Sequence, residues 1–183
     1  VMLVAEPRVA QILRQRYCAV YVDEYQDTDP AQVRLLQALT TPGSTMVAVG
    51  DPDQAIYGFR GADVRGILRF RDDFPTASRA PADIIVLRET RRFGSNIAQA
   101  AGRAIRRVSL GNLPAEIQRE HRTPACVKPE AGSVEAITFD SAAAQAAAVA
   151  DRIRRARLTG EVGAWSDMAV IVRSGVTQLP LLQ

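Results

Sequence analysis

Short apolar runs alternate with amphipathic stretches in the first half of the chain, a pattern that predicts strands separated by helices. The runs over residues 17–22 and 45–49 are almost wholly apolar, as expected of strands buried on both faces of a parallel sheet. An amphipathic pattern over residues 6–15 predicts a helix before the first strand. Between the two strands, Asp29 can cap a helix that begins at Pro30, where the missing N–H costs nothing.

The same alternation continues to the end of the chain. Residues 71–82 are polar and contain prolines, so they are the predicted connection between two domains, over residues 1–80 and 81–183. Residues 109–131 lack a clear period and predict an extended surface connection. Strands that alternate with helices imply parallel sheets, so the predicted fold class is α/β. Beyond the elements above, the pattern predicts helices over residues 63–70, 95–108 and 142–158, and strands over residues 84–87, 134–139 and 168–172.

Two acidic residues, Asp23 and Glu24, follow directly after the first predicted strand. The carboxyl ends of strands are where open α/β sheets bind ligands. One carboxylate there can hold Mg²⁺, and its neighbour can orient and deprotonate a water molecule, as a nucleotide triphosphatase requires. A solvated turn would also account for this pair taken alone.

Further polar and aromatic residues follow the second predicted strand. Gln54 can sense a terminal phosphate or the attacking water, and Arg60 can neutralise developing phosphoryl charge. Tyr57 and Phe59 offer aromatic faces on which bases could stack. Both aromatic side chains could instead belong to a core.

Composition adds little to this picture. The net charge of +3 and the isoelectric point near 9.2 are mildly basic, and almost all of the positive charge is arginine. Arginine suits phosphate recognition, but an arginine bias can equally reflect genome composition. Cys18 and Cys126 fit neither a metal spacing nor a disulfide framework; Cys18 is expected in a core. With no signal peptide or membrane-spanning run, we expect a reducing, cytoplasmic location and no membrane partner.

Three motifs in order resemble those of the UvrD/Rep/PcrA branch of superfamily 1 DNA helicases. Residues 23–28, DEYQDT, resemble motif II. Residues 50–62, GDPDQAIYGFRGA, are similar to motif III and are the most specific part. Residues 87–93, LRETRRF, look like a diverged motif IV, in which Thr90 and Arg91 replace the usual Asn-Tyr. The resemblance implies two partial RecA-like domains of the P-loop NTPase fold, with parallel sheets flanked by helices.

The resemblance also implies a role for each matched nucleotide-site residue. Asp23 would hold Mg²⁺, and Glu24 would be the general base. Gln54 would contact the γ-phosphate of ATP. Arg92 would reach the same phosphate from the second RecA-like domain, as an arginine finger does, with Arg91 as a minor competitor for that role.

The remaining matched residues would serve the DNA track. Arg60 would link the nucleotide to the DNA, while Tyr57 and Phe59 would contact single-stranded DNA. The family commonly has Trp in place of Phe59, so the smaller ring should stack on a base with less area. The implied parent protein is an ATP-dependent translocase that moves 3′ to 5′ on single-stranded DNA in repair or recombination.

Some family motifs are missing from the 183 residues. No Gly-x-x-x-x-Gly-Lys-[Ser/Thr] phosphate loop occurs, and no equivalents of motifs V and VI are found. Without the loop, the β- and γ-phosphates have no cradle. We therefore expect an internal segment of a helicase that does not hydrolyse ATP by itself, with the loop before Val1 and motifs V and VI after Gln183.

Two other functions fit the same residues. The motor could belong to a helicase–nuclease that resembles RecB or its actinobacterial relatives, with a nuclease domain or a partner subunit. Alternatively, a natural short protein could keep the fold as a binding or regulatory module without ATPase activity. His121, the only histidine, lies in the irregular segment and is expected to be solvated.

Overall fold

A computed structural model describes residues 6–173 of the chain. The chain divides into two compact units, Val1–Val134 and Glu135–Gln183. Both small sheets within the described residues are parallel and are accompanied by helices, in line with the α/β class. The predicted domain boundary near residue 80 stays a prediction. None of the described helices is long and apolar enough to cross a membrane.

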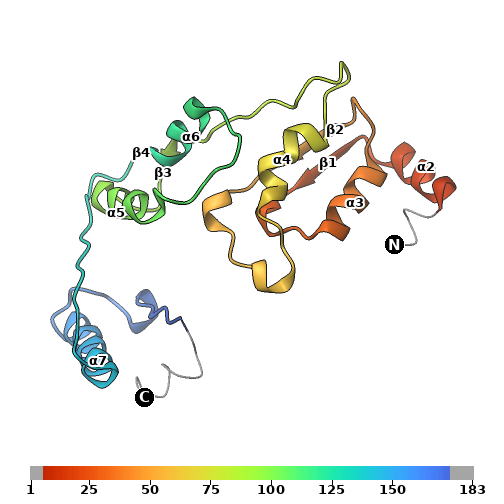
Figure 1. The fold of residues 1–183 in the computed structure, drawn as a ribbon. Helices are drawn as coiled ribbons and strands as arrows, with labels where there is room; N and C mark the ends of the chain where they lie inside the picture. The colour runs from red at the N-terminus through yellow and green to blue at the C-terminus, as the bar shows by residue number, and fades with distance from the viewer. Residues whose placement is uncertain (1–5, 174–183) are drawn as a thin grey trace. The chain divides into compact units, whose positions relative to one another are not determined.

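The first sheet of unit 1 pairs β1 (Ala19–Val22) with β2 (Thr45–Ala48) in parallel, with Ala19 opposite Thr45 and Val22 opposite Ala48 (Figure 1). Both strands fall within the predicted apolar runs. A parallel pair needs a crossover, and α3 (Pro30–Leu39) supplies it. Helix α2 (Pro7–Arg16) precedes β1, and its Arg14 Nε donates to the Ala38 carbonyl of α3 at 2.8 Å.

Helix α3 begins with the predicted cap. Asp29 Oδ1 accepts hydrogen bonds from the backbone N–H groups of Ala31 (2.7 Å) and Gln32 (2.9 Å). The Gln32 side chain accepts in return from the Asp29 N–H at 2.9 Å. This reciprocal capping box, followed by Pro30, fixes where the helix starts.

Tyr25 is the centre of the small core next to β1. Its side chain is fully buried, with a ring centroid 5.2 Å from that of Phe70 and 6.5 Å from that of Phe74, both edge-on. Phe70 lies in α4 (Arg65–Asp73), and Phe74 is the residue that ends this helix. The aromatic cluster therefore holds α4 against the 3₁₀ turn η1 (Tyr25–Asp27), which follows the two acids.

The rest of unit 1 contains β3 (Glu89–Thr90), α5 (Ser95–Ile105), α6 (Ala115–Arg122) and β4 (Ala125–Cys126). Strands β3 and β4 pair in parallel, with Glu89 opposite Ala125. The predicted irregular connection over residues 109–131 is therefore wrong in part. Three prolines suggested irregular chain, but the good helix formers between Pro114 and Thr123 form one continuous helix.

Unit 2 is built around the long helix α7 (Ala142–Leu158), which was predicted with these bounds. Ser141 caps it by accepting a hydrogen bond from the Ala144 N–H at 3.1 Å. Ala146 and Ala156 are buried on one of its faces. A 3₁₀ turn, η4 (Trp165–Asp167), follows it.

Several sequence predictions about strands and burial are wrong. No strand forms over residues 84–87, 134–139 or 168–172, although these segments are apolar. A strand requires a neighbour for its backbone hydrogen bonds, and no described segment pairs with them. Most of their apolar side chains are consequently exposed, up to 96% for Ile171. Cys18 is also exposed and belongs to no core.

Candidate functional site

The two acidic residues lie at the carboxyl end of the first sheet. The parallel ladder continues just beyond the strands, because Val49 N–H donates to the Val22 carbonyl (2.8 Å) and Tyr25 N–H donates to the Val49 carbonyl (2.9 Å). These bonds place Asp23 and Glu24 beside the Val49–Gly50 end of the second strand. The arrangement matches the strand-end geometry that the sequence predicts.

The second of the two acids, Glu24, has an unusual backbone conformation. Glu24 has φ 50° and ψ 43°, the left-handed region that non-glycine residues seldom occupy. Its N–H donates to Asp23 Oδ1 at 2.9 Å. Both carboxylates are solvent-exposed, so Asp23 keeps oxygens of the kind that Mg²⁺ prefers within reach of a ligand.

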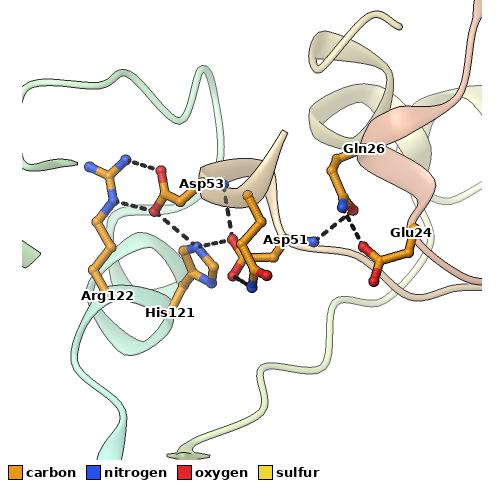
Figure 2. Close-up of polar contacts among 7 residues, drawn as sticks. Glu24, Gln26, Asp51, Asp53, His121 and Arg122 are labelled. Carbon is orange, nitrogen blue, oxygen red and sulfur yellow. Dashed lines mark hydrogen bonds and ion pairs between the residues drawn. The ribbon is translucent and has the colours of Figure 1, made fainter. Parts of the chain in front are cut away.

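A buried amide joins the two strand ends. Gln26 is only 1% exposed, and its Nε2 donates to Glu24 Oε2 at 2.6 Å. Its Oε1 accepts from the Asp51 backbone N–H at 3.0 Å. Figure 2 shows Gln26 lying between Glu24 and Asp51, so the motif II and motif III segments are connected directly.

Asp51 organises the turn that carries Gln54. Its side chain accepts from the Asp53 N–H (2.9 Å) and from Gln54 Nε2 (2.6 Å) at the 3₁₀ turn η2 (Pro52–Gln54). Burial acts to raise the pKa of Asp51, but hydrogen bonds from His121, Gln54 and the Asp53 backbone outweigh it and lower this pKa to about 2. Asp51 is therefore a carboxylate at neutral pH and holds the Gln54 amide.

His121 and Arg122, at the end of α6, contact the same turn (Figure 2). Arg122 makes a two-pronged ion pair with Asp53, from Nη2 to Oδ1 at 2.7 Å and from Nε to Oδ2 at 2.9 Å. His121 Nε2 lies 3.3 Å from Asp51 Oδ1 and 3.2 Å from Asp53 Oδ2. The prediction that His121 is solvated is wrong, because only 22% of its side chain is exposed.

The charges of this cluster favour a protonated imidazole. The hydrogen bond to Asp51 raises the pKa of His121, while burial opposes the increase. Ligand atoms of Asp51, Asp53 and His121 lie within 4.8 Å of one another, a spacing that a metal ion could use. However, Arg122 already engages both oxygens of Asp53, so we assign this cluster to ion pairing.

The aromatic residues of motif III lie at the surface. Phe59 is 81% exposed and Tyr57 is 36% exposed, so neither is a core residue. The Arg60 guanidinium lies over both rings, 5.0 Å from the Tyr57 centroid and 5.5 Å from that of Phe59. An exposed ring pair with an arginine offers both a stacking surface and a positive charge.

Arg92 lies in the loop between β3 and α5 and is exposed. Among residues 6–173, its guanidinium forms no hydrogen bond or ion pair, so no contact joins it to Glu24 or Gln54. The neighbouring Arg91 pairs with Glu89 at 3.2 Å. The role predicted for Arg92 at the γ-phosphate stays a prediction.

Sequence reasoning missed the residues that connect the predicted site. Gln26 and Asp51 occur in the quoted motifs without a predicted role of their own. The sequence also predicts no functional role for Asp53, His121 and Arg122. A glutamine two residues after a strand-end acid, in a segment that is otherwise buried, was an available signal for Gln26. Nothing in the sequence indicated that residues 121 and 122 would contact residues 51 and 53.

Comparison with known proteins agrees with the motifs. The UvrD/REP helicase N-terminal domain matches residues 1–75. ATP-dependent DNA helicase PcrA of Staphylococcus epidermidis is 38% identical over 100 residues, which cover 55% of this chain and 13% of that protein. PcrA of Staphylococcus aureus matches with the same identity and coverage. The chain thus spans only a small part of these relatives, and its residues 1–75 are similar to the UvrD/REP helicase N-terminal domain.

Proposed function

We propose that this chain is part of an ATP-driven DNA helicase that moves 3′ to 5′ on single-stranded DNA in repair or recombination. The observation that carries the proposal is the connection between Glu24 and the Asp51–Gln54 turn through Gln26 at the end of a parallel sheet. A motor of this kind needs a water-activating carboxylate and a phosphate sensor that are mechanically linked. The PcrA relatives are named as ATP-dependent DNA helicases.

The nucleotide roles follow from the chemistry of the strand ends. Asp23 offers an exposed carboxylate that fits a Mg²⁺ ligand, and the bound ion would neutralise charge on the phosphates. Glu24, with its carboxylate held by Gln26, would orient and deprotonate the attacking water. Gln54, held by Asp51, would contact the γ-phosphate as an uncharged sensor.

The DNA-facing roles belong to the exposed part of motif III. Tyr57 and Phe59 would stack on bases, and Arg60 would connect this surface to the nucleotide side. Arg92 would complete the site from a second RecA-like domain, which we place over residues 81–183 after a first one over residues 1–80. Closure of that domain on ATP would bring its guanidinium to the γ-phosphate.

The 183 residues contain no Gly-Lys-[Ser/Thr] phosphate loop. We therefore propose that the chain by itself does not hydrolyse ATP, and that activity belongs to a parent polypeptide that also supplies this loop. A helicase–nuclease would contain the same motor and add nuclease activity, which an assay of the parent would detect. A non-catalytic binding module would show no turnover in any context.

A test separates the two halves of motif III in the parent. Gln54→Ala should reduce DNA-stimulated ATP hydrolysis and leave the affinity for single-stranded DNA unchanged. Tyr57→Ala should weaken DNA affinity, by about 1 to 3 kcal/mol for one lost stacking contact. Equal loss of ATPase activity in both variants, with DNA affinity intact, would contradict this division of roles.

A further inference from the structure

Gln26 is a buried polar side chain for which the proposed chemistry has no direct use. It is one of the most buried side chains of the described residues, and it hydrogen-bonds to the exposed Glu24. A buried amide costs free energy unless its hydrogen-bonding groups are satisfied. Here one end of the amide binds the Glu24 carboxylate, and the other binds the backbone of the neighbouring strand end.

The orientation of this amide follows from its partners. The Asp51 N–H can only donate, so it must face the oxygen of Gln26. The Glu24 carboxylate can only accept when ionised, so it must face the nitrogen. A flipped amide would place oxygen against carboxylate and nitrogen against N–H. One orientation therefore satisfies both ends, and the Glu24 carboxylate is tied to one position relative to Asp51.

The backbone next to Asp51 leaves little room around this amide. A Cβ atom built on Gly50 would lie 2.5 Å from Gln26 Oε1, 2.7 Å from Ile67 Cδ1 and 3.1 Å from the Tyr25 nitrogen. Glycine is thus required at position 50 for the second strand end to approach Gln26 closely. The approach brings Asp51, which holds Gln54, within hydrogen-bonding distance of the amide.

The hydrogen bonds form one continuous connection from Glu24 through Gln26 and Asp51 to Gln54, with side-chain links of 2.6 Å at each end. Among the described residues, Gln26 is the one side chain that donates to the Glu24 carboxylate. Glu24 is otherwise held only by a backbone in the left-handed region. A shift of the Gly50–Asp51 segment would therefore move Gln26 and, with it, the carboxylate.

We propose that Gln26 is a positioning residue that orients the Glu24 carboxylate according to the position of the Gly50–Asp51 segment. The inference rests on the proposed ATP hydrolysis and identifies what couples its base to its phosphate sensor. Gln26 contacts no nucleotide in this scheme. Its removal should therefore lower the rate of the chemical step and leave ATP binding unchanged.

The test uses Gln26→Met in the parent polypeptide, because methionine keeps the length of the side chain and removes both hydrogen bonds. We expect kcat for DNA-stimulated hydrolysis to fall by about 10- to 100-fold, as for other residues that orient a catalytic group. KM for ATP should stay within about twofold of wild type. Gln32→Met is the matched control, since Gln32 binds only the Asp29 N–H at the start of α3, and its kcat should be unchanged.

A second background shows whether Gln26 acts through Glu24. In single-turnover assays, adding Gln26→Met to Glu24→Gln should cause no further loss, because residues that act as a unit are not additive. Gln26→Leu provides an independent version: it also removes both hydrogen bonds, but with a branched side chain. It should lower kcat as Gln26→Met does.

Each other outcome has a distinct meaning. If the wild-type parent is active and both Gln26 variants keep their kcat, the inference is overturned and the proposed function stands. The inference is also overturned if the Gln26→Met loss persists in full in the Glu24→Gln background. A parent without DNA-stimulated turnover overturns the proposed function and this inference with it.

Discussion

The contact between His121 and the motif III turn should make the stability of unit 1 depend on pH. The perturbation is His121→Gln, compared with wild type from about pH 5 to pH 9, the range in which histidine changes charge. His121 is the only histidine of the chain, so an imidazole titration belongs to this residue. Asp51, Asp53 and Arg122 are the charged groups that surround it.

The direction of the pH dependence of stability follows from the direction in which the pKa of His121 is shifted. The pKa of His121 is raised, chiefly by its hydrogen bond to Asp51, so the folded chain binds the proton more tightly than the unfolded chain. The resulting stability is fully present below the unfolded value of about 6.5 and is lost as pH rises through the higher folded value. A charge-assisted hydrogen bond that is mostly shielded from water should contribute about 1 to 2 kcal/mol.

The ionisation of Asp51 has the opposite effect on the pH dependence of stability. Its pKa is lowered from 3.8 to about 2, so its stabilisation is present above pH 3.8 and is lost as pH falls toward 2. The shift corresponds to about 2.5 kcal/mol at 1.36 kcal/mol per pKa unit. Because 32% of this side chain is exposed, we expect about 1 to 2 kcal/mol after screening by solvent. Stability should be greatest between these two ranges.

Two measurements check this account. An NMR titration of the single imidazole should give a pKa above the ordinary value of 6.5, and urea unfolding should show stability falling from about pH 6 to pH 9. His121→Gln should remove that slope. Glu161→Gln, which removes only the exposed partner of Arg152, should keep it. An unshifted imidazole, or the same slope in His121→Gln, would refute the reasoning.

Changes at three further residues test separate parts of the fold and site. Tyr25→Ala should lower the unfolding free energy by about 3 to 5 kcal/mol through loss of the aromatic core. Tyr25→Phe should be neutral or stabilising, because the buried hydroxyl has no partner among the described residues. Equal destabilisation of the two variants in urea unfolding would contradict this prediction. Asp29→Ala should cost about 1 kcal/mol through loss of the α3 capping box, and an unchanged denaturation midpoint would contradict this. Phe59→Ala, at an 81% exposed site, should change stability by less than about 0.5 kcal/mol while weakening single-stranded DNA binding by the parent; intact binding, measured by fluorescence anisotropy, would exclude a stacking role.

Local signals predicted the elements that depend on neighbouring residues in sequence. The capped start of α3 at Asp29 and the Ala-rich α7 formed as predicted, because caps and helical periodicity act over a few residues. The first helix and the β1 and β2 strands also formed within one or two residues of the predicted ranges. Helix α5 begins at Ser95 as predicted, but it ends at Ile105, before the predicted residue 108.

Signals that depend on distant residues were less informative. Apolar runs over residues 84–87, 134–139 and 168–172 have strand composition, yet strand formation requires a partner that composition cannot reveal. The site shows the same limit. Residue types at the strand ends indicated Glu24 and Gln54, but the Gln26 amide that connects them bonds to a segment 25 residues away. The contacts of His121 and Arg122 join chain segments about 70 residues apart.

The central claim is tested most directly by DNA-stimulated ATP hydrolysis. The account predicts turnover by the parent polypeptide that depends on single-stranded DNA and falls by about 10²- to 10⁴-fold in Glu24→Gln, as for loss of a general base. The isolated 183-residue chain should show no turnover. Robust hydrolysis by the isolated chain that Glu24→Gln abolishes, or a parent whose activity is indifferent to Glu24→Gln, would contradict the account.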